Sequence, residues 1–198
     1  MKKTGVKGFT MGVFLMVIAG LSYYTYLNNK TTSEKEIEKM SETQQLLEYN
    51  FTDAYPKTVR ETVKLHCKFL KNAYNDSFTE DELFTVNKQI RQMLDEELLE
   101  YNPQDQQLQG LKEEIARYKD NKQKYIGYKV AESSQIKYNT QGDREYAKVK
   151  VTITLQVGTN NQTVDEEYIL RKDEEDRWKI LGWQAENNQT IKAKGDTE

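Results

Sequence analysis

The sequence has little cysteine and histidine, and each scarcity excludes a kind of site. A single cysteine, Cys67, rules out an internal disulfide framework and a zinc site built from several cysteines. A single histidine, His66, argues against a metal site rich in that residue. We therefore predict no metal ion.

Several sequence motifs that carry chemistry are also missing. The chain has no glycine-rich phosphate loop, no His-Glu-x-x-His, no calcium-loop pattern and no Gly-x-Ser-x-Gly. The net charge of −3 gives no basic footprint for nucleic acid. We expect no cofactor and no nucleic-acid partner, and we assign no catalytic residue. Aromatic residues make up 11% of the chain, which argues against a fully disordered protein.

An uncharged stretch of 20 residues runs from position 8 to position 27. It matches the ~20 residues that a helix needs to cross the ~30 Å hydrocarbon core of a bilayer. Lys2, Lys3 and Lys7 precede it, and basic residues beside a membrane segment stay in the cytoplasm. We predict a single-pass protein of the cell membrane, with its N-terminus inside and its C-terminal domain outside the cytoplasm.

A cleaved signal peptide is the alternative interpretation of this stretch. Val17-Ile18-Ala19 offers a small-residue cleavage site. The apolar run continues to Leu27, however, and a cleavage site normally follows the apolar region. We favour an uncleaved anchor.

The rest of the chain is divided by changes in composition and periodicity. It is acidic, since all 32 Asp and Glu residues lie beyond position 30. The predicted parts are a cytoplasmic tail (1–7), a transmembrane helix (8–27), a helical stalk or linker (28–52), a folded domain (53–185) and a disordered polar tail (186–198). The stalk is a spacer helix in our interpretation, and a dimerising stalk is the alternative.

Three helices are predicted at the start of the folded domain. Asp53 and Pro56 suit the beginning of the first helix, which extends to about Tyr74. Thr79 and Glu82 form a capping box for the second helix, whose apolar stripe is predicted to continue through Leu94 and Leu98 to Asn102-Pro103. The third helix carries Leu108, Leu111, Ile115 and Tyr118.

The periodicity then changes from helical to alternating. Ile126, Tyr128 and Val130 alternate with polar residues, and an unbroken alternation follows from Ala147 to Val157. A turn and a returning strand from Val164 to Leu170 come next, and a last strand holds Trp178 and Ile180 on one face. Helices followed by a meandering antiparallel sheet predict an α+β domain, with the helices packed on one face of the sheet.

Two short motifs carry a family resemblance. Pro56-Lys-Thr-Val59-Arg-Glu-Thr-Val63 and Asp173-Glu-Glu-Asp-Arg-Trp178-Lys-Ile180 look like the opening and the end of nuclear transport factor two-like domains, the ketosteroid isomerase and SnoaL-like superfamily. With the leading anchor, the whole chain resembles an uncharacterised family of membrane-anchored bacterial proteins of that fold. The resemblance implies a cone-like domain, in which three helices fill the concave side of a curved antiparallel sheet.

Catalytic members of that superfamily use a tyrosine and carboxylates inside the cone. Tyrosines are plentiful here, but the acidic residues fall in runs such as Asp165-Glu166-Glu167, which we interpret as solvated faces. No carboxylate stands out at a strand position that faces the interior, so we do not transfer the catalytic residues of that superfamily to this chain. The residues that we expect to line the cone interior are His66, Tyr74, Tyr128 and Trp183.

His66 and Cys67 both lie on or beside the apolar stripe of the first domain helix. We interpret His66 as a packed helix-face histidine, with a pocket acid or base as the alternative. Neighbouring helical side chains do not face each other, so the histidine cannot readily activate the thiol. We expect Cys67 to be buried.

The function that we predict is binding to, or assembly with, other proteins of the cell envelope. It rests on analogy, because related cone domains assemble bacterial envelope machines. A homo-oligomer is also possible from the sequence. The alternative is a small-molecule binder or an enzyme that uses the cone cavity. A sealed apolar interior would favour assembly, and an open cavity with polar groups would favour a ligand or catalysis.

Overall fold

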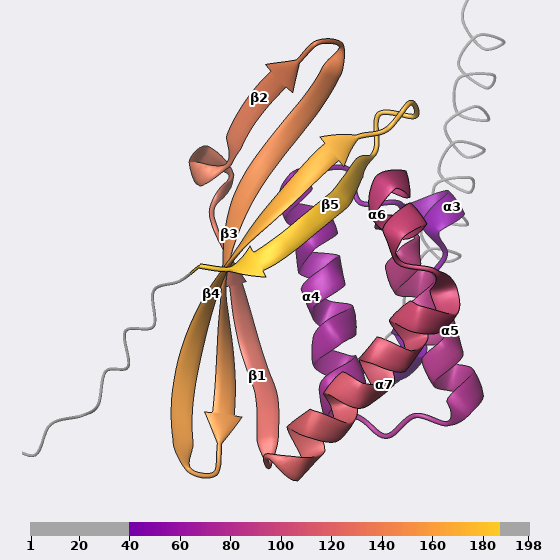
Figure 1. The fold of residues 1–198 in the computed structure, drawn as a ribbon, viewed down its shortest axis with the longest axis vertical. Helices are drawn as coiled ribbons and strands as arrows, with labels where there is room; N and C mark the ends of the chain where they lie inside the picture. Colours follow the sequence, from indigo (N-terminus) through magenta and orange to yellow (C-terminus); the bar gives the residue numbers. More distant parts are fainter. Residues whose placement is uncertain (1–39, 187–198) are drawn as a thin grey trace, which may run out of the picture. The chain divides into compact units, whose positions relative to one another are not determined.

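The computed structural model of the protein describes residues 40–186 (Figure 1). The chain divides into two units at the Gln45–Leu46 junction, and the features below belong to the second unit unless stated otherwise. The predicted cytoplasmic tail, the membrane segment, residues 28–39 of the stalk and most of the polar tail lie outside the described residues. Within those residues, no helix combines the length and the apolar character needed to span a bilayer.

Six helices precede the sheet within the described residues. Their bounds are Glu42–Leu47 (α2), Phe51–Ala54 (α3), Val59–Asn75 (α4), Glu80–Arg91 (α5), Glu96–Tyr101 (α6) and Gln104–Asp120 (α7). Helix α4 packs against strands of the sheet, and α5 and α7 pack against α4 and against each other. Helices α4, α5 and α7 therefore lie on one side of the sheet, as the alternation of the strands predicted (Figure 1).

The helix starts are set by side-chain caps. Thr79 and Glu82 form the predicted capping box of α5. Helix α4 begins at Val59, later than predicted, because Thr58 and Glu61 form a capping box there. Each of these caps satisfies backbone N–H groups that the first helical turn leaves without a partner.

The predicted second helix is interrupted, which corrects the expectation of one continuous stripe. Between α5 and α6 the backbone bonds to the last strand instead: the amide of Ile180 donates to Met93 O, and the amide of Asp95 donates to Ile180 O, both at 2.8 Å. Asp95 then caps α6 by accepting from the amide of Glu97. Leu94 thereby forms an isolated parallel bridge with Ile180.

The sheet has five antiparallel strands. Their bounds are Gln123–Val130 (β1), Lys137–Gln141 (β2), Arg144–Val157 (β3), Asn160–Lys172 (β4) and Trp178–Ala185 (β5). The order is β1-β3-β4-β5, and β2 also pairs with β3. Strand β1 pairs with the second half of β3 and β2 with its first half, so one edge of the long β3 is shared between them. A short 3-10 helix, Ser133–Gln135 (η1), lies between β1 and β2.

Strand β1 differs from the predicted alternation because it contains a bulge. The register with β3 shifts between Tyr125 and Gly127. Tyr125 is therefore buried, whereas Ile126, expected on the same face as Tyr128 and Val130, is 40% exposed. An extra residue in one strand shifts the alternation, so that the side chains before the bulge point to the opposite face from the one that unbroken alternation predicts.

The core lies between the sheet and the helices. Every second residue of β3 from Ala147 to Leu155 is buried, and Trp178 and Ile180 are buried on β5, as their alternation predicted. Residues upstream of Asp53 also contribute, since Leu46 is buried and Phe51 packs against the core. The structure is thus an α+β fold, with helices first and an antiparallel sheet packed against them.

Candidate functional site

A cavity of about 330 Å³ lies between the helices and the last strand. We call it the helix–sheet cavity. It is lined by residues of α4 to α7, of their connections and of β5: His66, Leu70, Tyr74, Asn87, Ile90, Leu94, Leu98, Asn102, Gln106, Gln107, Gly110, Leu111, Glu114, Arg117 and Trp183. Its volume is at the lower end of the ~300–1,000 Å³ that is usual for ligand sites.

The cavity has apolar walls and a few polar groups. Leucine and isoleucine side chains from α4, α5, α6 and α7 face it, and Trp183 borders it from β5. Tyr74 donates a hydrogen bond of 2.7 Å to Glu114, and an Arg117 nitrogen lies 3.9 Å from the same carboxylate. The Arg117 side chain is 70% exposed, so the cavity reaches the protein surface.

Three rings lie together where α4 meets the sheet. The Trp183 ring stacks on Tyr168, with centroids 5.7 Å apart, and meets His66 edge-on at 4.8 Å. The Tyr168 hydroxyl lies 3.2 Å from Nδ1 of His66 and 3.9 Å from the Cys67 sulfur. His66 and Cys67, which are consecutive residues of α4, thus both contact the hydroxyl group of Tyr168 on β4, although their side chains point in different directions.

Burial keeps the histidine and the cysteine of this cluster uncharged. Both residues are 0% exposed. Desolvation lowers the pKa of His66 to about 3 and raises the pKa of the Cys67 thiol to about 12. The expectation of a buried thiol is confirmed. The histidine is packed as well, but its Nε2 has no hydrogen-bond partner within residues 40–186.

Glu166 is a buried carboxyl group that the sequence interpretation missed. It lies on β4, and its Oε2 is buried without a hydrogen-bond partner among the described residues. Burial first and Glu114 second raise the pKa of Glu166 to about 7, which Tyr168 offsets in part by hydrogen bonding. A carboxyl group with this pKa exchanges protons near neutral pH.

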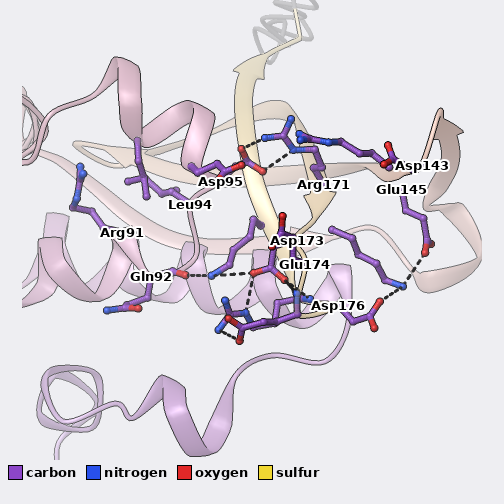
Figure 2. A pocket seen from close by; sticks show the side chains of 17 residues that line it. Arg91, Gln92, Leu94, Asp95, Asp143, Glu145, Arg171, Asp173, Glu174 and Asp176 are labelled. Atoms are coloured by element: carbon purple, nitrogen blue, oxygen red, sulfur yellow. Dashed lines mark hydrogen bonds and ion pairs between the residues drawn. The ribbon is translucent and has the colours of Figure 1, made fainter.

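A second cavity, of about 570 Å³, is lined mainly by charged residues (Figure 2). We call it the charged cleft. Arg171 points at Asp95 and donates to both of its carboxylate oxygens. Lys172 contacts Glu145 at 3.0 Å, and Lys179 donates to Gln92 O at 2.7 Å.

The charged cleft holds parts of the fold together. Its ion pairs join β4 to the α5–α6 connection and to the β2–β3 hairpin, and Figure 2 shows these side chains directed at one another. Since its most buried charges already have partners of opposite sign, we give the cleft a structural role.

One comparison with known proteins identifies a family. A family model described as a domain of unknown function (DUF6715) matches residues 1–183. The chain belongs to this family. No curated protein matches the sequence. The geometry of this member of the DUF6715 family is therefore the guide to its function.

Three of the four predicted pocket residues line the helix–sheet cavity. His66 and Tyr74 reach it from α4, and Trp183 reaches it from β5. Tyr128 does not: it lies on β1, where its ring contacts Tyr125. Strands β3 and β4 separate β1 from β5 in the sheet, so Tyr128 and Trp183 lie on different parts of it.

Two residues of this region could have been found from periodicity. Glu166 has the same strand phase as Tyr168 and Leu170, which places it on the helix-facing side although it stands in an acidic run. Asn87 lies four residues after Leu83 and so belongs to the apolar stripe of α5. Within the described residues, no group of three histidines, cysteines or acidic residues is suited to hold a metal ion.

Proposed function

We propose that the α+β unit is a small-molecule-binding domain and that its ligand occupies the helix–sheet cavity. The observation that carries the proposal is the cavity itself, which has apolar walls, reaches the surface at Arg117 and contains buried polar groups. A protein that used this region only as a core would fill it with side chains, since protein interiors are close-packed.

This choice favours the second of the two functions considered from the sequence. An open interior with polar groups was the expected mark of a ligand site, and a sealed apolar interior the mark of assembly. Assembly with envelope proteins stays a prediction, and no described surface specifies a partner for it. Catalysis would need a reacting group beside the ligand, and Glu166, the carboxyl group with a raised pKa, is not among the residues that line the helix–sheet cavity.

The nuclear transport factor two-like fold and the location outside the cytoplasm are part of the proposal. The order of the elements and the helices on one sheet face support the cone-like fold. The uncharged stretch at 8–27 supports a membrane anchor with the domain outside. A C-terminal reporter that works only outside the cytoplasm should be active, and activity of a cytoplasmic reporter instead would reverse the orientation.

Filling the cavity tests ligand binding directly. Gly110 lines the cavity from α7, and a Cβ atom added there would meet nothing within 4 Å. We expect Gly110→Phe to fill the cavity and Gly110→Ala to leave it open. The full-length chain and both variants should be screened by thermal shift against a chemically diverse set of small molecules.

The expected result is a set of compounds that stabilise the wild type and Gly110→Ala but not Gly110→Phe. Stabilisation by the same compounds in all three proteins would move the site elsewhere. The absence of any stabilising compound would contradict the proposal, because a ligand that binds the folded state raises the melting temperature by mass action.

A further inference from the structure

Two polar side chains of the helix–sheet cavity are buried without complete hydrogen bonding. His66 is 0% exposed and Asn87 is 1% exposed. Both line the cavity, the first from α4 and the second from α5. Neither Nε2 of His66 nor Nδ2 of Asn87 has a hydrogen-bond partner within residues 40–186. A buried polar group that is left unpaired destabilises the folded state, so two in one cavity call for an explanation.

The ring of His66, which lines the cavity, is an uncharged hydrogen-bonding group. Its other ring nitrogen, Nδ1, lies 3.2 Å from the Tyr168 hydroxyl, and the Tyr168 and Trp183 rings meet the histidine ring edge-on. A hydroxyl can donate to Nδ1 or accept from it, so Nε2 can serve as a donor or as an acceptor. Asn87 Nδ2 is always a donor.

Glu114 and Arg117 are the charged residues that line the cavity, and they are not arranged to recognise a charged ligand. Glu114 accepts from Tyr74 and lies near Arg117. The carboxylate thus has both a donor and a cation beside it. The remaining walls are uncharged: leucine and isoleucine side chains, Trp183, Gly110 and the amides of Asn102, Gln106 and Gln107. Such walls disfavour an ion, because a charge moved from water into apolar surroundings costs far more than a neutral group.

We propose that the ligand is an uncharged, largely apolar molecule whose hydroxyl or carboxamide group bonds to His66 and Asn87. Either group can donate and accept hydrogen bonds, so it satisfies both nitrogens whichever role His66 takes. The apolar body of the ligand lies along Leu70, Ile90 and Leu111. This inference rests on the proposed function and specifies the chemistry of its ligand.

Five probes of similar size test this specificity in the full-length chain. They are benzyl alcohol, benzamide, toluene, benzoate and benzylamine, and their binding can be followed by the fluorescence of Trp183, which borders the cavity. The Trp183→Phe variant identifies the signal that comes from this residue. We expect benzyl alcohol and benzamide to bind roughly tenfold more tightly than toluene, and the two charged probes to bind more weakly than toluene.

A pair of asparagine variants supplies a test that needs no ligand. Asn87→Leu removes the unpaired amide at similar size, and it should leave the protein as stable or more stable. Asn72→Leu is the matched control. Asn72 is also buried on a helix, but its Nδ2 donates to Lys68 O at 2.9 Å, so this substitution should lower stability.

The outcomes separate this inference from the proposed function. Equal affinities for toluene, benzyl alcohol and benzamide would overturn the inference and leave ligand binding in place. Tighter binding of benzoate or benzylamine would also overturn it. A loss of stability in Asn87→Leu as large as that in Asn72→Leu would show that the amide has a structural role instead. Failure of every compound in the Gly110 experiment would remove the proposed function itself.

Discussion

At the scale of single residues, neighbours in one acidic run have opposite environments. Glu166 faces the helices, and burial together with Glu114 raises its pKa to about 7. Glu167 faces the other side of the sheet, where Lys148 lies 3.5 Å from its carboxylate. Strand alternation alone separates them, because successive side chains of a strand point to opposite faces.

This contrast predicts a pH dependence of stability. Between about pH 4.5 and 7 the folded protein retains a proton on Glu166 that the unfolded chain has released. Stability from this group therefore falls as the pH rises through that range. Glu166→Gln keeps the site neutral, so its stability relative to the wild type should increase from pH 5 to pH 8. Urea denaturation at several pH values measures the difference.

Glu167→Gln is the control for this prediction, and it should show no such gain with pH. His66 titrates in the opposite sense: its folded pKa of about 3 makes stability rise with pH up to about 6.5. That contribution is common to the wild type and Glu166→Gln and cancels in their difference. Parallel stability curves for these two proteins would contradict the assignment of the raised pKa to Glu166.

At the scale of elements, the short connection between α5 and α6 ties the helices to the sheet. Asp95 has three roles in it: its amide bonds to Ile180, its carboxylate caps α6, and the same carboxylate pairs with Arg171 of β4. The Asp95 and Arg171 side chains are 4% and 7% exposed, so the pair is buried. A helix interior could not supply these contacts, which explains the interruption.

Removing Asp95 should therefore cost much more than removing its exposed neighbour. Asp95→Ala leaves the buried Arg171 without its main partner, and we expect a loss of about 3–5 kcal/mol in the free energy of unfolding. Glu97 also contacts Arg171 but is 55% exposed, so Glu97→Ala should cost at most ~1 kcal/mol. Chemical denaturation compares the two, and equal losses would show that the buried pair does not stabilise this connection.

At the scale of the whole molecule, the described fold includes residues before the predicted domain start at Asp53. Leu46 is 2% exposed, and the ring of Phe51 stacks on Phe69 of α4 with centroids 6.4 Å apart. The side chain of Gln89 on α5 also donates to the backbone oxygens of Leu47 and Tyr49. This segment therefore packs on the first two domain helices.

The corresponding prediction concerns truncation. A chain of residues 40–198 should unfold cooperatively, whereas a chain that starts at residue 53 should have a clearly lower melting temperature. Full burial of a side chain such as Leu46 contributes roughly 1.5–3 kcal/mol, and the partly buried Phe51 adds to it. Thermal unfolding followed by circular dichroism tests this, and equal melting temperatures would place the segment outside the stabilising core.

Local patterns in the sequence determined the α+β class, the capping box at Thr79 and the alternation along β3, because each depends on residues close together in the chain. The same patterns brought His66, Tyr74 and Trp183 into consideration as pocket residues. Tertiary structure alone decided the bulge at Ile126, the interruption at Asp95 and the position of Tyr128 away from the cavity. These features depend on partners distant in sequence, such as β3 for the bulge and Ile180 for the interruption. Sequence phase could have placed Glu166 on the helix-facing side, but the pKa of its carboxyl group is raised first by burial and second by Glu114 of α7, and both depend on how the helices pack on β4.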